Sequence, residues 1–163
     1  MGNPPPGAAT NPDLANPDPA NPALPGAPPA PVRLHVRQDG LEPPIVPGDP
    51  ARLERVLQNL LDNAVSFSPP GGVVDVVIAT HGNRVRLAVC DDGPGIPADA
   101  RERVFERFHS LRPEAEDFGR HSGLGLAIAR TIIEAHNGTL TACDPLPPHR
   151  GARLVVDLPA WRR

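Results

Sequence analysis

Proline is concentrated at the N-terminal end of this chain and limits where a folded core can form. Eleven of the 24 prolines lie in residues 1–31, where neither Lys nor Arg occurs. Because proline fixes φ and removes a backbone donor, this stretch cannot supply the hydrogen-bonded elements of a core. We expect residues 1–31 to be an extended, disordered linker, or alternatively a proline-rich ligand for a partner, and residues 32–160 to form the folded domain.

The composition excludes several classes of protein. A net charge of -3 and a pI of about 6.0 give no global basic surface for nucleic acid or an anionic membrane. The chain has no lysine, so any cationic contact to a phosphate must come from arginine. Cys90 and Cys143 are expected to be reduced packing thiols. With no apolar run near the roughly 20 residues that cross a bilayer and no leader peptide, we expect a soluble, cytoplasmic chain.

Strands are indicated by alternating apolar and polar residues bounded by turns. His81-Gly82-Asn83 is a short glycine-containing turn, so the segments on either side of it should form an antiparallel hairpin. Five strands are expected, at residues 32–37, 73–80, 84–90, about 139–143 and about 152–158.

Helices are indicated by apolar stripes with recognisable ends. Asp49-Pro50 supplies an N-cap and a first-turn proline for a helix that runs to about Ser68. A second helix is expected over residues 124–136 and ends at Asn137-Gly138. A short helix should begin near Pro97 and carry three apolar residues, Val104, Phe105 and Phe108.

Two asparagines lie four residues apart inside the first expected helix. Asn59 and Asn63 therefore project from one face, flanked by apolar positions that pack the helix against a core. Amide oxygens suit a hard cation such as Mg²⁺, which takes few protein ligands and keeps phosphate oxygens and waters. The alternative is that both amides only cap a core helix.

A carboxylate ends the third expected strand. Asp91 follows an apolar run, so its side chain should lie at the mouth of the sheet, where it could accept a hydrogen bond from an exocyclic amine such as adenine N6. Gly93 and Gly95 permit a sharp turn and close approach to a flat ring. An ordinary Asp-Gly turn after a strand remains the alternative.

A glycine loop precedes the second long helix. Gly123 and Gly125 leave backbone amides and a helix N-terminus free to face phosphate oxygens. The loop is not a Walker A motif, because that motif needs a lysine. It also lacks the glycine spacing of the dinucleotide fingerprint. Residues 110–122, which are weakly periodic and carry mixed charge, are interpreted as a mobile lid.

Other residues near these loops are candidates for ligand contact. Arg107, Arg120 and Arg130 could contact phosphates, although surface arginine is the commoner role. Phe67 follows the paired asparagines and could pack near a base. The histidines of the second half match no metal-binding spacing.

Taken in order, these elements resemble the ATP-binding catalytic domain of bacterial sensor histidine kinases, within the wider group that includes DNA gyrase B and MutL. The resemblance covers residues 32–158. Shorter segments, at residues 66–72 and 116–119, are similar to acid- and envelope-sensing kinases of alphaproteobacteria. Four segments in family order carry the resemblance: residues 57–64 resemble the N box, 91–97 the G1 box, 104–108 the F box and 122–128 the G2 box.

The resemblance implies a fold and a site. The fold would be a two-layer α/β sandwich, with a mixed sheet of about five strands covered on one face by about three helices. Asn63 would coordinate Mg²⁺ that bridges the phosphates of ATP, with Asn59 as the second catalytic amide, and Asp91 would hold the adenine amino group. The implied ligand-binding residues are Asn59, Asn63, Phe67, Asp91, Gly93, Gly95, Ile96, Phe105, Arg107, Phe108, Ser122, Gly123, Leu124, Gly125 and Leu126.

The implied function is donation of the ATP γ-phosphate to a histidine on a separate dimerisation domain, and indirectly to a response regulator. The parent kinase would lie in the inner membrane, and the isolated chain would be a monomer. No His-Glu-Leu-Arg-x-Pro-like segment occurs, so this chain alone should not autophosphorylate. Two positions depart from the family pattern: Ser66 stands where many such kinases have a basic residue, and His121 where glycine is common.

Two other functions are alternatives. A nucleotide-gated interaction module, such as an anti-sigma-factor-like serine kinase, would share part of the site, but the four-box pattern disfavours it. A gyrase- or chaperone-type ATPase would need large further domains and a catalytic glutamate one turn before the second asparagine. This chain has Asn59 there.

Overall fold

The computed structural model describes residues 28–40, 43–109 and 123–161. Their strands form one sheet in the order β1-β2-β3-β5-β4. The predicted hairpin is confirmed, since β2 and β3 pair in antiparallel register. The five strands are β1 (Arg33–Asp39), β2 (Val73–His81), β3 (Arg84–Cys90), β4 (Thr139–Cys143) and β5 (Arg153–Pro159).

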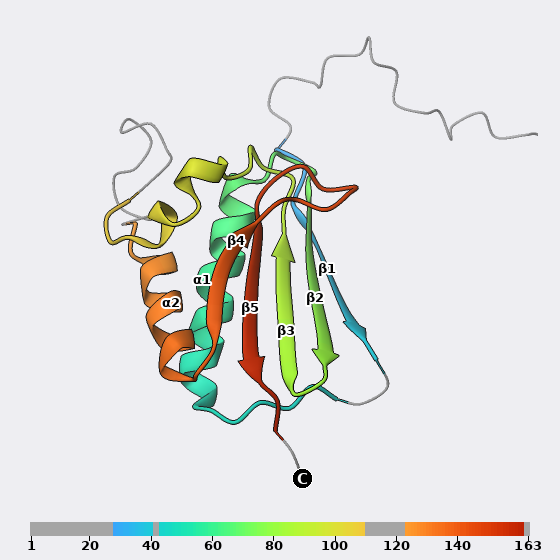
Figure 1. Ribbon diagram of the computed structural model, residues 1–163. Coiled ribbons are helices and arrows are strands. Elements are labelled where there is room, and N and C mark those ends of the chain that lie inside the picture. Colours follow the sequence, from blue (N-terminus) through green and yellow to red (C-terminus); the bar gives the residue numbers. More distant parts are fainter. Residues whose placement is uncertain (1–27, 41–42, 110–122, 162–163) are drawn as a thin grey trace, which may run out of the picture.

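The sheet is mixed because one of its pairings is parallel. β1 runs parallel to β2, with Val36 opposite Val76, whereas the other three pairings are antiparallel. A parallel pair needs a crossover connection, and α1 (Pro50–Phe67) provides it. β5, the last strand in the chain, lies between β3 and β4 (Figure 1).

Both long helices begin and end close to where the sequence predicts. Asp49 caps α1, because its Oδ1 accepts hydrogen bonds from the backbone N–H groups of Ala51 at 3.0 Å and Arg52 at 3.3 Å. α2 spans Gly125–Ala135 and is followed by Asn137, which has a positive φ of 57°.

The predicted short helix is two separate 3₁₀ turns, η1 (Ala98–Ala100) and η2 (Arg103–Phe105). Phe108 lies beyond them with a φ of 61°, which a continuous helix would not allow. The three helical segments therefore comprise α1, α2 and this pair of turns.

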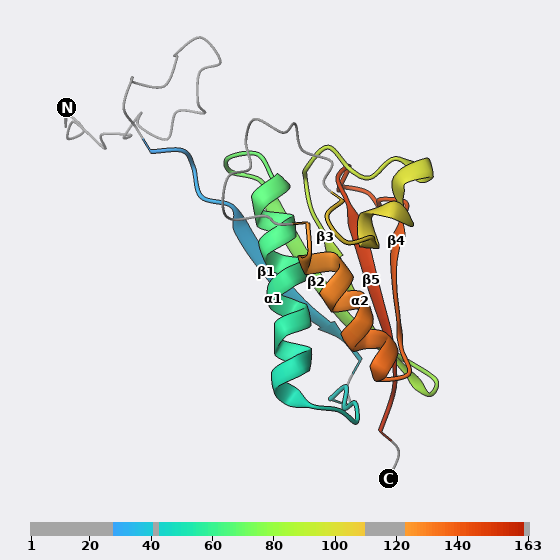
Figure 2. The ribbon, with the colours of Figure 1, turned by 90° about the vertical axis from the view of Figure 1, so that its left-hand side faces the viewer.

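The core lies between the sheet and the two long helices, which pack side by side on one face of the sheet (Figure 2). α1 turns one stripe toward the core, and Val56, Leu60 and Ala64 on it are at most 2% exposed. This arrangement confirms the predicted two-layer α/β sandwich. The buried apolar residues of the core are Val56, Leu60, Ala64, Val74, Val76, Val89, Val104, Phe105, Ala129, Ile133, Leu140, Leu154, Val156 and Leu158.

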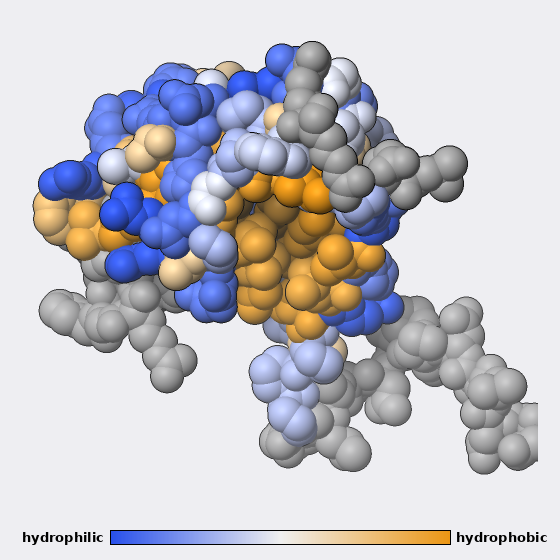
Figure 3. Space-filling view, turned by 90° about the horizontal axis from the view of Figure 1, so that it is seen from below, coloured by the Kyte–Doolittle hydropathy of each residue, from blue (hydrophilic) through white to orange (hydrophobic). Residues whose placement is uncertain are grey.

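The core does not extend to the edge of the sheet. Leu34 and Val36 of β1 lie in register with the buried Val74 and Val76, yet they are 49% and 63% exposed. Apolar residues also gather around a hollow on the face seen from below (Figure 3).

The cysteines are free thiols, with Cys90 buried in β3 and Cys143 half-buried in β4. None of the helices within residues 28–40, 43–109 and 123–161 is long and apolar enough to cross a bilayer. Most of the predicted linker, residues 1–27, and the predicted lid, residues 110–122, lie outside the described residues.

Candidate functional site

A cleft of about 890 Å³ opens where α1, the loop after β3 and the start of α2 meet. The three motifs singled out in the sequence therefore converge, although they are far apart along the chain. Ten of the predicted site residues line the cleft: Asn59, Asn63, Phe67, Asp91, Gly95, Ile96, Gly123, Leu124, Gly125 and Leu126.

Asp91 is a buried carboxylate that lines this cleft. Its Oδ1 accepts backbone hydrogen bonds from Gly93 at 2.9 Å and from Ala152 at 2.8 Å. Oδ2 has no donor among the described residues and remains available to a ligand. Burial raises the pKa of Asp91 above its ordinary value, while the two backbone hydrogen bonds act in the opposite direction.

A backbone loop packs tightly against this carboxylate. A Cβ on Gly151 would lie 2.1 Å from Asp91 Oδ1, so only glycine fits there. Gly93 does not line the cleft, but its amide holds Asp91, and a Cβ on it would lie 2.8 Å from the carbonyl oxygen of Phe67. Gly93 therefore supports the position of the carboxylate, whereas Gly95 lines the cleft directly.

The paired asparagines extend from α1 into the cleft, as their spacing predicts. Asn59 lies against the start of α2, because a Cβ on Gly125 would be 3.5 Å from its Oδ1. Asn59 Nδ2 and His109 Nε2 are both buried without a partner among the described residues. Unpaired buried nitrogens in an open cleft are explained by a ligand or by waters that complete their hydrogen bonds.

The second glycine loop packs against the chain at Phe108, just before the segment predicted to be a lid. Gly123 has a φ of 65°, and its carbonyl accepts a hydrogen bond of 3.1 Å from the backbone N–H of Phe108. A Cβ on Gly123 would lie 3.0 Å from the backbone of Phe108. Glycine is therefore needed for both the conformation and the contact.

Besides Gly93, three predicted site residues do not line the cleft. Phe105 is 6% exposed in the core, and Phe108 is 77% exposed. Arg107 lies at a separate surface depression. Ser122 and Arg120 lie outside the described residues.

Arg130, the other described phosphate candidate, is occupied elsewhere. It pairs with Glu102 at 3.0 Å and Glu134 at 3.1 Å, and its guanidinium lies 5.0 Å from the Phe105 ring centroid. These contacts raise the pKa of Arg130, in spite of partial burial, and hold it at the same surface depression as Arg107.

Sequence reasoning missed one cation of the cleft. Arg55 lines it, one helical turn before Asn59, and has no ion-pair partner among the described residues. The sequence could have indicated Arg55 as a cleft residue, because residues 55, 59 and 63 share one helical face.

The donor set fits a divalent cation that is shared with a phosphate ligand. Within the described ranges, no group of three or more His, Cys, Asp or Glu side chains could form a metal cage. Amide oxygens from α1 in a cleft that also receives a glycine loop suit Mg²⁺, which is held by few protein ligands when phosphates supply the others.

Comparisons with known proteins agree with this geometry. Residues 48–162 match the family described as "Histidine kinase-, DNA gyrase B-, and HSP90-like ATPase". Sensor protein ChvG of Rhizobium meliloti is 46% identical over 120 residues, which are 71% of this chain and 21% of that protein. The chain thus spans about a fifth of the length of this curated relative.

Solved structures share the fold. The mycobacterial sensor histidine kinase MprB has a TM-score of 0.68 and 36% identity, and the match covers 81% of this chain and 84% of that one. Full-length ShkA in complex with AMPPNP has a TM-score of 0.66 and 30% identity, with 81% and 26% covered. The chain therefore belongs to the histidine kinase-, DNA gyrase B- and HSP90-like ATPase family and is a catalytic domain of the sensor histidine kinase type.

Proposed function

We propose that the cleft binds ATP with Mg²⁺ and presents the γ-phosphate to a histidine on a separate dimerisation domain. The observation that carries this proposal is the convergence of Asp91, the paired asparagines and the glycine loop on one cleft. The AMPPNP complex of the similar kinase ShkA supports a triphosphate as the ligand.

The two ends of the cleft would have separate tasks. The free Oδ2 of Asp91 would accept a hydrogen bond from the adenine amino group, with Ile96 and Phe67 beside the ring. Asn63 would hold Mg²⁺, which supplies charge neutralisation for the phosphates, and Asn59 would contact the phosphate region.

The remaining residues would orient the phosphates and exclude water. Leu124 and Gly125 line the cleft at the start of α2, and their amides would bind phosphate oxygens. Catalysis would then rest on positioning and electrostatic stabilisation rather than on a covalent intermediate of this chain. We place this domain in the cytoplasm, in a kinase anchored in the inner membrane whose phosphoryl group passes to a response regulator.

Calorimetry of the full chain with ATP, with and without Mg²⁺, tests the proposal. We expect binding that requires Mg²⁺ and is lost in Asp91→Asn and Asn63→Ala. Parent-like binding by both variants would refute the site assignment.

A second experiment separates the alternative function. The chain is incubated with ATP and either a histidine-kinase dimerisation domain or a sigma-factor and anti-anti-sigma pair. Acid-labile phosphate on the dimerisation domain supports the proposal, and acid-stable phosphate on the anti-anti-sigma protein would favour the serine kinase.

A further inference from the structure

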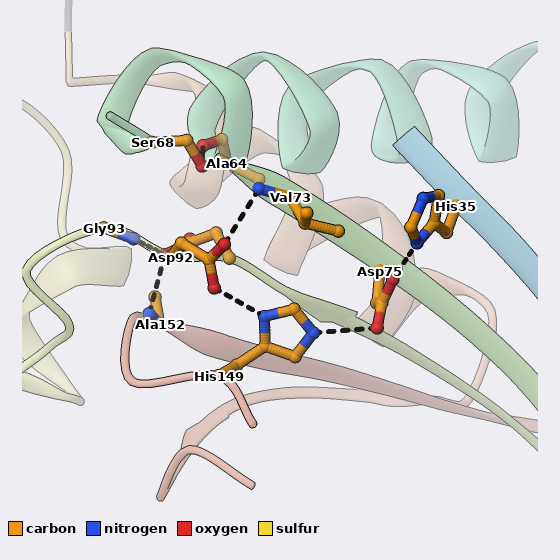
Figure 4. A network of polar contacts seen from close by, with 10 residues as sticks. His35, Ala64, Ser68, Val73, Asp75, Asp92, Gly93, His149 and Ala152 are labelled. Atoms are coloured by element: carbon orange, nitrogen blue, oxygen red, sulfur yellow. Dashed lines mark hydrogen bonds and ion pairs between the residues drawn. The ribbon is translucent and has the colours of Figure 1, made fainter. Parts of the chain in front are cut away.

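His149 is a buried histidine to which the proposed chemistry gives no role. It lies in the loop between β4 and β5, and its side chain is 8% exposed. Nε2 lies 2.8 Å from Asp75 Oδ2, and Nδ1 lies 2.8 Å from Asp92 Oδ1 (Figure 4). Ionised carboxylates only accept hydrogen bonds, so both ring nitrogens must donate. The ring is therefore an imidazolium cation in this arrangement.

The surroundings of His149 favour that charge. Burial acts to lower the pKa of His149, but hydrogen bonds and charges from Asp75 and Asp92 outweigh it, and the pKa lies above its ordinary value. Burial likewise acts to raise the pKa of Asp92, but hydrogen bonds from Val73 and His149 lower it overall. Both shifts favour the ion pair.

The ion pair connects to the carboxylate of the cleft through short stretches of backbone. Asp92 follows Asp91 directly, and its Oδ2 accepts the backbone N–H of Val73 at 2.8 Å. On the other side, the loop that carries His149 donates to Asp91 from Gly151 N at 3.1 Å and Ala152 N at 2.8 Å. His149 thus fastens together the two backbone segments that hold Asp91.

We propose that His149 is a positioning residue of the nucleotide site, whose imidazolium clamps the β4–β5 loop onto Asp92 and Asp75 and so fixes Asp91 for adenine. The inference rests on the proposed function and adds that nucleotide binding depends on pH. The clamp forms when His149 is protonated and both carboxylates are ionised. Nucleotide affinity should therefore fall as the pH rises and His149 loses its proton.

Other titratable and charged groups surround the clamp. Asp75 also meets His35 on β1, at 3.2 Å, and Arg33 acts on Asp92. Asp91 carries a charge next to Asp92. Cys90, on β3, is near Asp75 and Asp91, and burial raises its pKa. His35, whose side chain is 61% exposed, lies against the same carboxylate from the solvent side, which makes it a matched control.

The test measures adenosine and MgATP binding to the full chain from about pH 6 to about pH 9, a range that spans the titration of a histidine. Adenosine has no phosphate to titrate, so its affinity reports on the Asp91 end alone. In the parent, adenosine affinity should decline as the pH rises. In His149→Gln, the adenosine affinity at neutral pH should be about tenfold lower than that of the parent, which is the loss expected for one charge-assisted contact. The adenosine affinity of this variant should also be independent of pH.

His35→Gln is the control for the loss of a histidine next to Asp75. His35→Gln should follow the parent profile. If His149→Gln kept the affinity and the pH profile of the parent, or lost thermal stability alone, the clamp would have no role in binding. Failure of the parent to bind MgATP at any pH would instead overturn the proposed function.

A second measurement needs no variant. Binding and protonation are reciprocal, so adenosine should raise the pH at which the His149 ring titrates in NMR spectra of the parent. An unchanged midpoint at saturating adenosine would overturn the inference.

Discussion

Gly151 and Asp91 meet so closely that a Cβ on the glycine would lie 2.1 Å from the carboxylate oxygen Oδ1. The backbone N–H of Gly151 also donates to the carbonyl of Asp91 at 3.1 Å. Any side chain at position 151 must therefore push the β4–β5 loop away from the cleft.

Gly151→Ala should consequently destabilise the fold by about 2 kcal/mol, the usual cost of overpacking, and weaken ATP binding in the same variant. Gly125→Ala is the control for stability, because its Cβ would meet Asn59 at an ordinary 3.5 Å. Denaturant unfolding and calorimetry measure the two effects. Equal stability of the two variants would contradict the proposed clash.

Asp91→Asn should lose ATP binding and gain thermal stability at neutral pH. Burial raises the pKa of Asp91, so its ionised form is less favourable in the folded chain than in the unfolded chain. That cost is present above the pKa of the folded state and disappears as the carboxyl group protonates. The gain in melting temperature should thus vanish near pH 3, where both chains are neutral at this position.

Asp92→Asn is the matched control and should change stability in the opposite direction. The pKa of Asp92 is lowered, so its ionised form stabilises the fold above its ordinary pKa, and the contribution is lost as the pH falls. Equal melting shifts for the two substitutions at neutral pH would contradict this assignment.

Arg55→Ala should weaken binding in proportion to the number of phosphates on the ligand. Arg55 lines the cleft without an ion-pair partner among the described residues, and Ser66 provides no charge there. We expect about a tenfold loss for ATP, a smaller loss for ADP and none for adenosine. Arg52→Ala, which removes an arginine paired with Asp49 outside the cleft, should bind all three as the parent does.

His136→Ala should loosen the contact between the two long helices. His136 Nδ1 donates to the carbonyl of Ile132 at 2.7 Å, and Nε2 accepts the backbone N–H of Asp49 at 3.1 Å. Losing both bonds should cost about 1–2 kcal/mol of unfolding free energy. Urea unfolding measures it, with the exposed His81→Ala as a control that should remain near parent stability.

The local elements could be predicted because their signals are local. Asp49-Pro50 marks the start of α1, and the glycine turn at residues 81–83 marks the hairpin. The 3₁₀ turns were mistaken for one helix because apolar spacing does not reveal the break, which depends on packing of Val104 and Phe105 in the core.

The site could be predicted only as far as it lies within motifs. Asn59, Asn63 and Asp91 line the cleft as expected, but Arg107 does not, because sequence proximity to a motif does not fix the direction of a side chain. No sequence pattern indicated a role for His149. Its partners lie 57 and 74 residues away, and only the sheet order brings them together.

That sheet order also constrains how the chain can assemble during synthesis. β5 is an interior strand that pairs with β3 and β4, so neither of these two neighbours has its full set of partners until residues 153–159 have been made. Partly synthesised chains would present open strand edges that invite association with other chains. We therefore expect nascent chains that stop before residue 153 to depend on chaperones, even though most of the cleft is already encoded.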